Sequence, residues 1–280
     1  MKSKSEKRKK EEAAGNGSAN RLTSKQLEVL LLAYQFRFLT SINLATYLGQ
    51  NRSNPARVRL ELLARMGYLA KRFDGSYRLQ HRPVEYYLTP LSRQPLLAEL
   101  TRPSQREFKR LYARPNCSIR FVDRNLAVFD IYLALRKLYG LRLRVATQPQ
   151  LNVEVFDYLP QPLADIFATL DARTDHTQAW LIDYFDDGTS IGIHGRRVSL
   201  YMDYKDEGGW KASGWPFPVV LIVCQTPALL KRADKRVRYL ERQTYSGVDF
   251  RLIDLATLNG LASADQPDWL DPIARTKTRL

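Results

Sequence analysis

The spacing of apolar residues changes near residue 140, and this change constrains the fold more than any other feature of the 280-residue chain. Before Gly140, apolar residues recur at the three- and four-residue spacing of helices in several segments. Beyond it they alternate or form short continuous runs, as strands do. The run Val219–Cys224 is apolar throughout, which is typical of a strand covered on both faces. The pattern predicts a mostly helical N-terminal domain followed by a domain in which helices flank a mixed sheet.

Three helices are predicted at the start of the N-terminal domain. Thr23 and Gln26 have the spacing of a capping box, Thr40 can cap a second short helix, and Asn54 can cap a third, with Pro55 at its first position. We expect the third helix to stop at Gly67. Its apolar positions, which we expect to face the core, are Val58, Leu60, Leu62, Leu63 and Met66.

A β-hairpin is predicted directly after these helices. Residues 68–73 and 76–79 flank Asp74-Gly75, a strong short-range hairpin signal, and residues 86–90 return as a further strand. Three helices followed by a hairpin is the order of a winged helix-turn-helix. In that fold the third helix enters the major groove of DNA and the wing contacts the phosphate backbone.

Positive charge is concentrated in the same part of the chain. Residues 21–120 carry 18 basic and six acidic side chains, whereas residues 121–280 carry 20 of each. A basic domain gains affinity for a polyanion by releasing its counterions, so we expect double-stranded DNA as the partner. The predicted DNA-contact residues lie on the third helix, the turn before it and the wing: Arg52, Arg57, Arg59, Arg65, Lys71, Arg72 and Arg78. The alternative is a protein-docking winged helix whose arginines form a solvated face.

Composition excludes several other classes of protein. No run approaches the roughly 18 apolar residues that span a membrane, and the first residues lack the apolar stretch of a signal peptide, so we expect a cytoplasmic protein with no membrane partner. Two cysteines and three histidines lack the spacing of a zinc site or a disulfide framework. We expect residues 1–20 to be a disordered basic tail, which either aids solubility or contacts phosphates, and residues 101–120 to be a linker.

The remaining elements define the domains as 21–100 for the winged helix and 121–280 for the α/β domain. We expect helices at residues 122–139, 196–204 and 226–242. The expected strands lie at residues 141–145, 151–156, 164–170, 178–185, 190–193, 219–224 and 250–254.

Two carboxylates fall at predicted strand positions, Asp165 before one strand and Asp183 near the end of the next. Carboxylates on adjacent strands can hold Mg²⁺, which can activate water for attack on a phosphodiester. The alternative is that both are structural carboxylates with satisfied partners. Asp186 and Asp187 precede Gly188, where turn formation is their commoner role.

The chain resembles the replication-relaxation proteins of bacterial plasmids and other mobile elements over most of residues 21–255. The resemblance rests on the order of five motifs, each short. They are the Tyr-Leu-Thr-Pro of residues 87–90, the Pro-x-x-Asp that ends at Asp165, the Asp-x-Gly-Thr of residues 186–189, the basic helix with a tyrosine near its end at residues 197–201, and the strand Val219–Cys224 with a basic helix after it. The resemblance implies a winged helix joined to a domain similar to the PD-(D/E)xK nuclease fold.

Carried over by position, the resemblance makes Asp165 the strand aspartate of the nuclease motif and Asp186 its second acid. This sequence departs from the motif, because Tyr184 occupies the place of the glutamate and Arg197 that of the helix lysine. Reading the motif from Asp183 instead leaves Phe185 where the catalytic lysine would stand. The resemblance therefore implies a nuclease-like domain without activity.

We accordingly expect a DNA-binding protein that acts in the replication, processing or transfer of a mobile element, with a homodimer or other replication and transfer proteins as further partners. One alternative is an active Mg²⁺-dependent endonuclease, with Asp165, Asp183 and Arg197 catalytic and Mg²⁺ held by the two aspartates. Another is a dimeric winged-helix transcriptional regulator.

Overall fold

The computed structural model describes residues 22–73, 75–100, 105–110, 116–151, 157–171, 178–262 and 267–278. The predicted tail at residues 1–20 lies outside the described residues, and so does much of the predicted linker. Among the helices of the described ranges, none has both the length and the apolar character needed to cross a bilayer.

The three N-terminal helices are confirmed as α2 (Ser24–Phe36), α3 (Ser41–Tyr47) and α4 (Asn54–Arg65). Thr23 forms the predicted capping box with Gln26, and the Thr40 hydroxyl accepts the Asn43 N–H. The cap of α4 differs from the prediction. Ser53 stands at that position without a side-chain hydrogen bond, so α4 starts one residue early, with proline still in its first turn.

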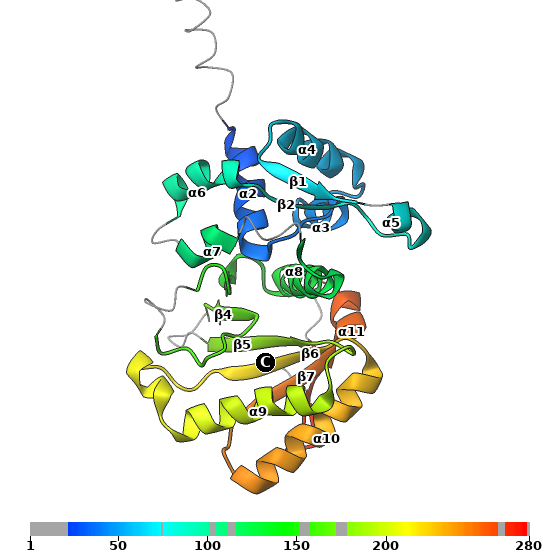
Figure 1. The fold of residues 1–280 in the computed structure, drawn as a ribbon. Helices are drawn as coiled ribbons and strands as arrows, with labels where there is room; N and C mark the ends of the chain where they lie inside the picture. Colours follow the sequence, from blue (N-terminus) through cyan, green and yellow to red (C-terminus); the bar gives the residue numbers. More distant parts are fainter. Residues whose placement is uncertain are drawn as a thin grey trace, which may run out of the picture.

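The predicted hairpin is wrong in its second strand. β1 (Leu69–Arg72) pairs antiparallel with β2 (Glu85–Leu88), and residues 76–79 belong instead to the short helix α5 (Gly75–Leu79). Tyr77 explains the difference, because its buried ring lies inside the loop and its hydroxyl donates to Glu85 Oε2 at 3.0 Å. Burying Tyr77 in this way coils the segment, and α5 projects from the side of the N-terminal part (Figure 1).

The prediction that Val58 and Leu62 face the core is also wrong. Their side chains are 53% and 38% exposed, whereas Ala56, Leu60 and Leu63 are buried. The buried residues follow the i, i+4, i+7 spacing of one helix face, which turns Val58 and Leu62 toward the opposite side. As a result α4 presents apolar as well as basic side chains to solvent.

Short helices lead to the long helix of the second part. They are η1 (Pro90–Ser92), α6 (Arg93–Glu99) and α7 (Gln105–Arg110). The long helix α8 (Ile119–Tyr139) begins three residues before the prediction, because the Ser118 hydroxyl accepts the Phe121 N–H and caps it. A short η3 (Gly140–Arg142) then leads into the sheet.

Within the described residues, seven strands form one mixed sheet in chain order, which confirms the mixed-sheet prediction. The strands are β3 (Leu143–Thr147), β4 (Ile166–Leu170), β5 (Gln178–Phe185), β6 (Val219–Cys224), β7 (Phe250–Asp254), β8 (Trp269–Asp271) and β9 (Thr276–Thr278). The central strands β5, β6 and β7 are parallel, and the outer neighbours pair antiparallel.

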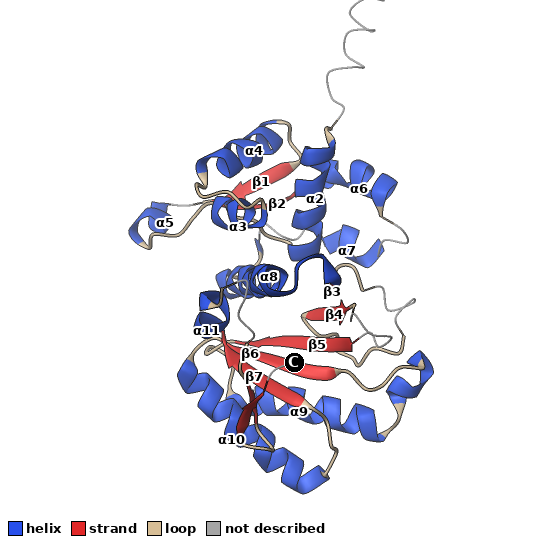
Figure 2. Cartoon of the chain, turned by 180° about the vertical axis from the view of Figure 1, so that it is seen from behind, coloured by secondary structure: helices blue, strands red, loops and turns tan. Residues whose placement is uncertain are grey.

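Two helices connect the parallel strands, α9 (Ile191–Asp206) and α10 (Pro227–Thr244), with η4 (Gly209–Ser213) after α9. They cover one face of the sheet, and α8 with α11 (Leu255–Gly260) covers the other (Figure 2). The predicted strand at 190–193 is wrong, since Ser190 caps α9 and residues 191–193 form its first turn. Most of the predicted strand at 151–156 lies outside the described residues.

The core has two layers, one on each face of the sheet. Along β5 the side chains alternate, so Trp180 and Ile182 pack toward α8 while Leu181 and Phe185 pack toward α9 and α10. The α8 layer continues into the buried residues of α2, α3 and α4, so one apolar core joins the N-terminal helices to the sheet.

Asp130 of α8 provides a polar link to the N-terminal helices, because Asn43 Nδ2 of α3 donates to its carboxylate. Burial raises the pKa of Asp130 to about 6, despite the opposing hydrogen bond. In the unfolded chain this carboxyl has a pKa of about 3.9, so folding raises its pKa. The resulting contribution to stability is fully present below pH about 3.9 and is lost as the pH rises through about 6.

We therefore expect Asp130→Asn to be more stable than the wild type by up to about 2 kcal/mol at pH 8 and equally stable near pH 4. The amide oxygen can still accept from Asn43 but carries no buried charge. Urea unfolding at pH 4, 6 and 8 measures the difference, with the exposed Asp206→Asn as the control. A difference that does not change with pH would contradict this account of Asp130.

Candidate functional site

Asp165 and Asp183 lie opposite each other, at the carboxyl end of the central parallel strands. The antiparallel register pairs Ile166 with Ile182, and Asp165 continues it by one residue toward Asp183. The Asp165 N–H donates to Asp183 Oδ1 at 3.2 Å, and both side chains are buried. Ligands in open α/β sheets bind at this end of the strands, which makes the two aspartates the candidate site.

Asp183 is bound by two side chains of α9. Arg197 Nε donates to Asp183 Oδ2 at 2.6 Å and Arg197 Nη2 to Oδ1 at 3.2 Å, which makes a two-point ion pair. The Tyr201 hydroxyl donates to Asp183 Oδ2 at 2.6 Å. The Asp183 and Arg197 side chains are 3% and 14% exposed, so the pair is almost fully withdrawn from water.

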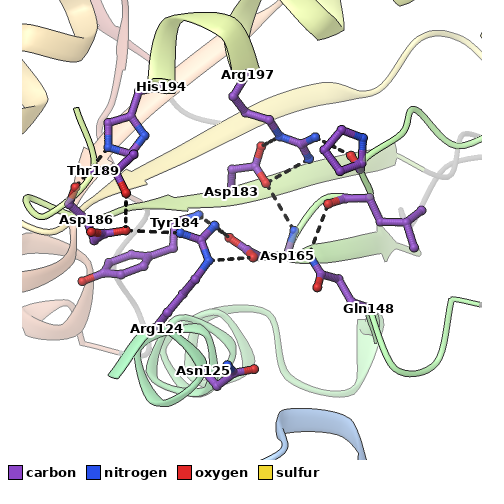
Figure 3. Close-up of polar contacts among 12 residues, drawn as sticks. Arg124, Asn125, Gln148, Asp165, Asp183, Tyr184, Asp186, Thr189, His194 and Arg197 are labelled. Carbon is purple, nitrogen blue, oxygen red and sulfur yellow. Dashed lines mark hydrogen bonds and ion pairs between the residues drawn. The ribbon is translucent and has the colours of Figure 1, made fainter. Parts of the chain in front are cut away.

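Asp165 is bound from the other face of the sheet. Arg124 of α8 donates from Nη2 to Asp165 Oδ2 at 2.6 Å, and the Tyr184 N–H donates to the same oxygen at 2.9 Å. Figure 3 shows the two arginines reaching the neighbouring aspartates from opposite sides of the strands. Two carboxylates this close repel each other when both are charged, and each has its own guanidinium to offset the repulsion.

A third aspartate extends the network at the end of β5. Arg120 Nη2 donates to Asp186 Oδ1 at 2.7 Å, and the Thr189 hydroxyl donates to Oδ2 at 2.9 Å. Arg124 Nη1 lies 3.4 Å from Asp186 Oδ2 and so connects Asp186 to Asp165. The turn predicted at Asp186 is present, closed by the Thr189 N–H to the Asp186 carbonyl, but its carboxylate also belongs to the network. Three aspartates and three arginines therefore balance in charge.

The pKa values of the two central acids shift in opposite directions, down for Asp183 and up for Asp165. Burial is the strongest influence on Asp183 and would raise its pKa, but Arg197 and Tyr201 outweigh burial and hold the pKa below the usual value. Burial raises the pKa of Asp165 above its usual value, because Arg124 offsets it only in part and Asp183 adds repulsion. For Asp186, hydrogen bonds from Thr189 and Arg120 outweigh burial and lower the pKa.

The residues at this position do not fit the Mg²⁺ site that the two strand carboxylates predicted. A magnesium ion needs open carboxylate oxygens and several waters. Here arginines 124 and 197 already engage both central carboxylates, each with one contact of 2.6 Å. Across the described residues, no group of three acidic, histidine or cysteine side chains is placed to hold a metal.

The cavity beside Asp165 is small. A cavity of about 70 Å³ lies between α2, α8 and the end of β3, with Arg37, Phe121 and Gln148 among its lining residues. Pockets for small-molecule ligands usually enclose about 300 Å³ or more. Because arginines engage both carboxylates, Asp165 and Asp183 form a satisfied polar cluster at the carboxyl end of the parallel strands.

The sequence predicted Asp165, Asp183 and Arg197 as one site, and the structure brings these three together. The sequence pattern did not indicate Arg120 and Arg124, which complete the network from α8. Their only signal was a pair of arginines at i, i+4 in the first turns of a helix whose next turns are buried in the core.

The predicted DNA-contact residues gather at the other end of the molecule. Arg52, Arg57, Arg65, Lys71 and Arg78 are exposed, and Arg59 is half-buried. Lys71 is paired with Glu61 at 2.6 Å, and Arg57 donates to Asn54 Oδ1 at 2.8 Å. Arg52, Arg59, Arg65 and Arg78 have no ion-pair partner in the part of the chain that the structure describes.

Arg72 differs from the other predicted contact residues because its guanidinium is used inside the protein. It donates to the Cys117 carbonyl at 2.7 Å and to the Tyr77 hydroxyl at 3.1 Å, and it lies 3.6 Å from the fully buried Glu85 carboxylate. We therefore assign Arg72 to the base of the β1–β2 pair and leave it out of the exposed basic surface.

Comparison with known proteins adds no further guide to function. No protein-family model, curated protein or solved structure matches this chain.

Proposed function

We propose that this protein binds double-stranded DNA through a winged helix-turn-helix in which α4 is the recognition helix. The observation that carries the proposal is the outer face of α4, where Arg57 and Arg65 flank the exposed Val58 and Leu62. We call these four residues the α4 face. Helices in the major groove use arginines for guanine edges and phosphates, and apolar groups for thymine methyls.

The position of α4 supports this proposal. It lies at the end of the molecule opposite α9 and α10, so its outer face is open to a large partner (Figure 1). Arg78 on the projecting α5 and Arg52 before α4 are two further exposed cations of this part of the chain that can contact phosphates. In this proposal α5 takes the role of the wing tip that the predicted hairpin was expected to fill.

For the α/β domain we propose a nuclease-like fold of the PD-(D/E)xK type that has lost metal-dependent catalysis. Arginines 124 and 197 occupy the carboxylates that would otherwise hold the ion. Together with the resemblance to replication-relaxation proteins, this supports a role in the replication, processing or transfer of a plasmid or other mobile element in the cytoplasm.

The proposal is tested by fluorescence anisotropy of a labelled duplex with the full chain over a series of salt concentrations. We expect the logarithm of the binding constant to fall linearly with the logarithm of the salt concentration, with a slope of about −0.9 for each phosphate neutralised. Binding to peptides or proteins but not to DNA would support the docking alternative instead. A footprint with two half-sites about one helical turn apart would favour the dimeric regulator.

The apolar part of the α4 face leads to a separate prediction. We expect Val58→Ala with Leu62→Ala to lower affinity for a selected binding site about fivefold, because two apolar contacts are truncated. Affinity for random duplex and the salt slope should stay unchanged, since neither residue carries charge. Anisotropy on the two duplexes measures this, with the exposed Leu141→Ala as the control. An equal loss on both duplexes would contradict base contact by these residues.

A further inference from the structure

The helix α10 is strongly basic although its domain is not. Its 18 residues include six basic and two acidic side chains, whereas residues 121–280 as a whole are balanced. The positive charge of α10 does not appear in the net charge of the domain, because acidic residues elsewhere in the domain balance it. It makes α10 a second concentration of positive charge, apart from the α4 face.

The exposed side chains of α10 form a stripe along the helix. Lys231, Lys235, Tyr239 and Arg242 are exposed, at the i, i+4, i+8, i+11 spacing that places residues on one helix face. We call these four residues the α10 stripe. At a rise of about 1.5 Å per residue it extends about 17 Å. Leu229, Ala233 and Val237 are buried on the other side, so the stripe faces away from the sheet.

The remaining basic residues of α10 contact other side chains of the protein and are not part of the stripe. Arg232 pairs with Asp187 at 2.8 Å, and Arg238 pairs with Asp234 one turn earlier. Arg236 lies 5.4 Å from the centre of the Tyr239 ring and against Gly195 of α9, where a Cβ would lie 2.4 Å from its Nε.

The three cations of the α10 stripe have no ion-pair partner among the described residues. Arg196 of α9 adds a fourth exposed cation next to the position where α9 meets Arg236. The exposed acids of α9, Asp203 and Asp206, lie toward its other end, where Met202 meets Thr244. The unpaired charge of α10 therefore stays positive along most of the stripe.

We propose that the α10 stripe binds the phosphodiester backbone of a second DNA segment, so that one molecule bridges two segments. This inference rests on the proposed function of the α4 face. The match is one of charge, because unpaired lysine and arginine at regular spacing suit a polyanion and an exposed aromatic ring can stack on a base.

The positions of the two surfaces require two segments. The helices α4 and α10 lie at opposite ends of the molecule, with α8 and the sheet between them, in both views of the chain (Figures 1 and 2). A straight duplex bound on the outer side of α4 is separated from α10 by the body of the protein. The two surfaces therefore serve separate DNA segments.

A bridging assay with the full chain tests the inference. A biotinylated duplex on beads is loaded with protein, washed, and offered a labelled second fragment, either duplex or single-stranded. The test variant combines Lys231→Gln, Lys235→Gln and Arg242→Gln. The control combines Arg144→Gln, Lys211→Gln and Lys277→Gln, three exposed cations outside both surfaces. Circular dichroism and light scattering establish that each variant is folded and has the oligomeric state of the wild type.

We expect the wild type and the control to retain the second fragment. The α10 variant should retain at least about tenfold less while binding the first duplex with unchanged affinity, because three phosphate contacts are lost from one surface only. Tyr239→Ala should lower capture of the single-stranded fragment severalfold and leave duplex capture unchanged.

Three results would contradict either the inference about the α10 stripe or the proposed function of the α4 face. Unchanged bridging by the α10 variant would overturn the inference, and would point to a dimer that holds one duplex on each α4 face. A wild type that binds the first duplex but retains no second fragment would also overturn it. A wild type that does not bind the first duplex would overturn the proposed function itself.

Discussion

Replacing Arg57 and Arg65 with glutamine is expected to lower the affinity for duplex DNA at least about tenfold at physiological salt and to reduce the salt slope by about two. Both side chains are exposed on α4, and neither is paired with an acid in the part of the chain that the structure describes. Their charge is therefore available to phosphates. Glutamine keeps the helix and most of the side-chain length, so the variant isolates charge.

Anisotropy titrations at several salt concentrations give both quantities. The matched control is Lys211→Gln with Lys277→Gln, which removes the same charge from exposed positions on η4 and β9. We expect the control to change affinity less than about twofold, because exposed charges beyond a Debye length are largely screened. Equal effects of the two pairs would mean that only net charge matters and that α4 has no special role.

Removing Arg197 is expected to cost about 3–5 kcal/mol of unfolding free energy at pH 7, because Asp183 would be left charged and buried. Arg197→Met keeps much of the side-chain volume and removes the guanidinium. The double variant Asp183→Leu with Arg197→Met should recover most of the loss, since no unpaired charge remains. Urea unfolding measures both, and the exposed pair of Arg232 with Asp187 provides a control worth less than about 1 kcal/mol.

The pH dependence of the same variant has a defined sign. In the wild type the pKa of Asp183 is lowered, so its stabilising contribution is present above the unfolded pKa of about 3.9 and is lost as the pH falls through the folded value. Without Arg197 the effect of burial dominates and raises that pKa. The deficit of Arg197→Met should therefore shrink as the pH falls from 7 toward 4. A deficit that is constant over this range would contradict a buried charge pair.

Local signals in the sequence predicted much of the fold. The capping residues Thr23 and Thr40 and the apolar run Val219–Cys224 act through contacts within a few residues, so their elements were placed correctly. The segment after β1 could not be predicted in this way. Its coiling depends on the contact of Tyr77 with Glu85 of β2, which the sequence does not mark.

The candidate site was predicted in part for the same reason. Asp165 and Asp183 occupy strand positions that adjacent pairing brings together, and Arg197 follows on the next helix. Arg124 comes from α8, 41 residues before Asp165, and reaches it only because α8 packs across the opposite face of the sheet. Without Arg124 the two acids look like a metal site, and with it they form two separate ion pairs.

The measurement that tests the central claim most directly is incubation of supercoiled plasmid with the purified chain, with and without Mg²⁺ or Mn²⁺, resolved on a gel. We predict a salt-sensitive mobility shift and no nicking under either condition, because we propose that the α4 face binds DNA, and Arg124 and Arg197 occupy the acids. Metal-dependent nicking that Asp165→Asn abolishes, with the shift retained, would contradict the account and establish an active nuclease.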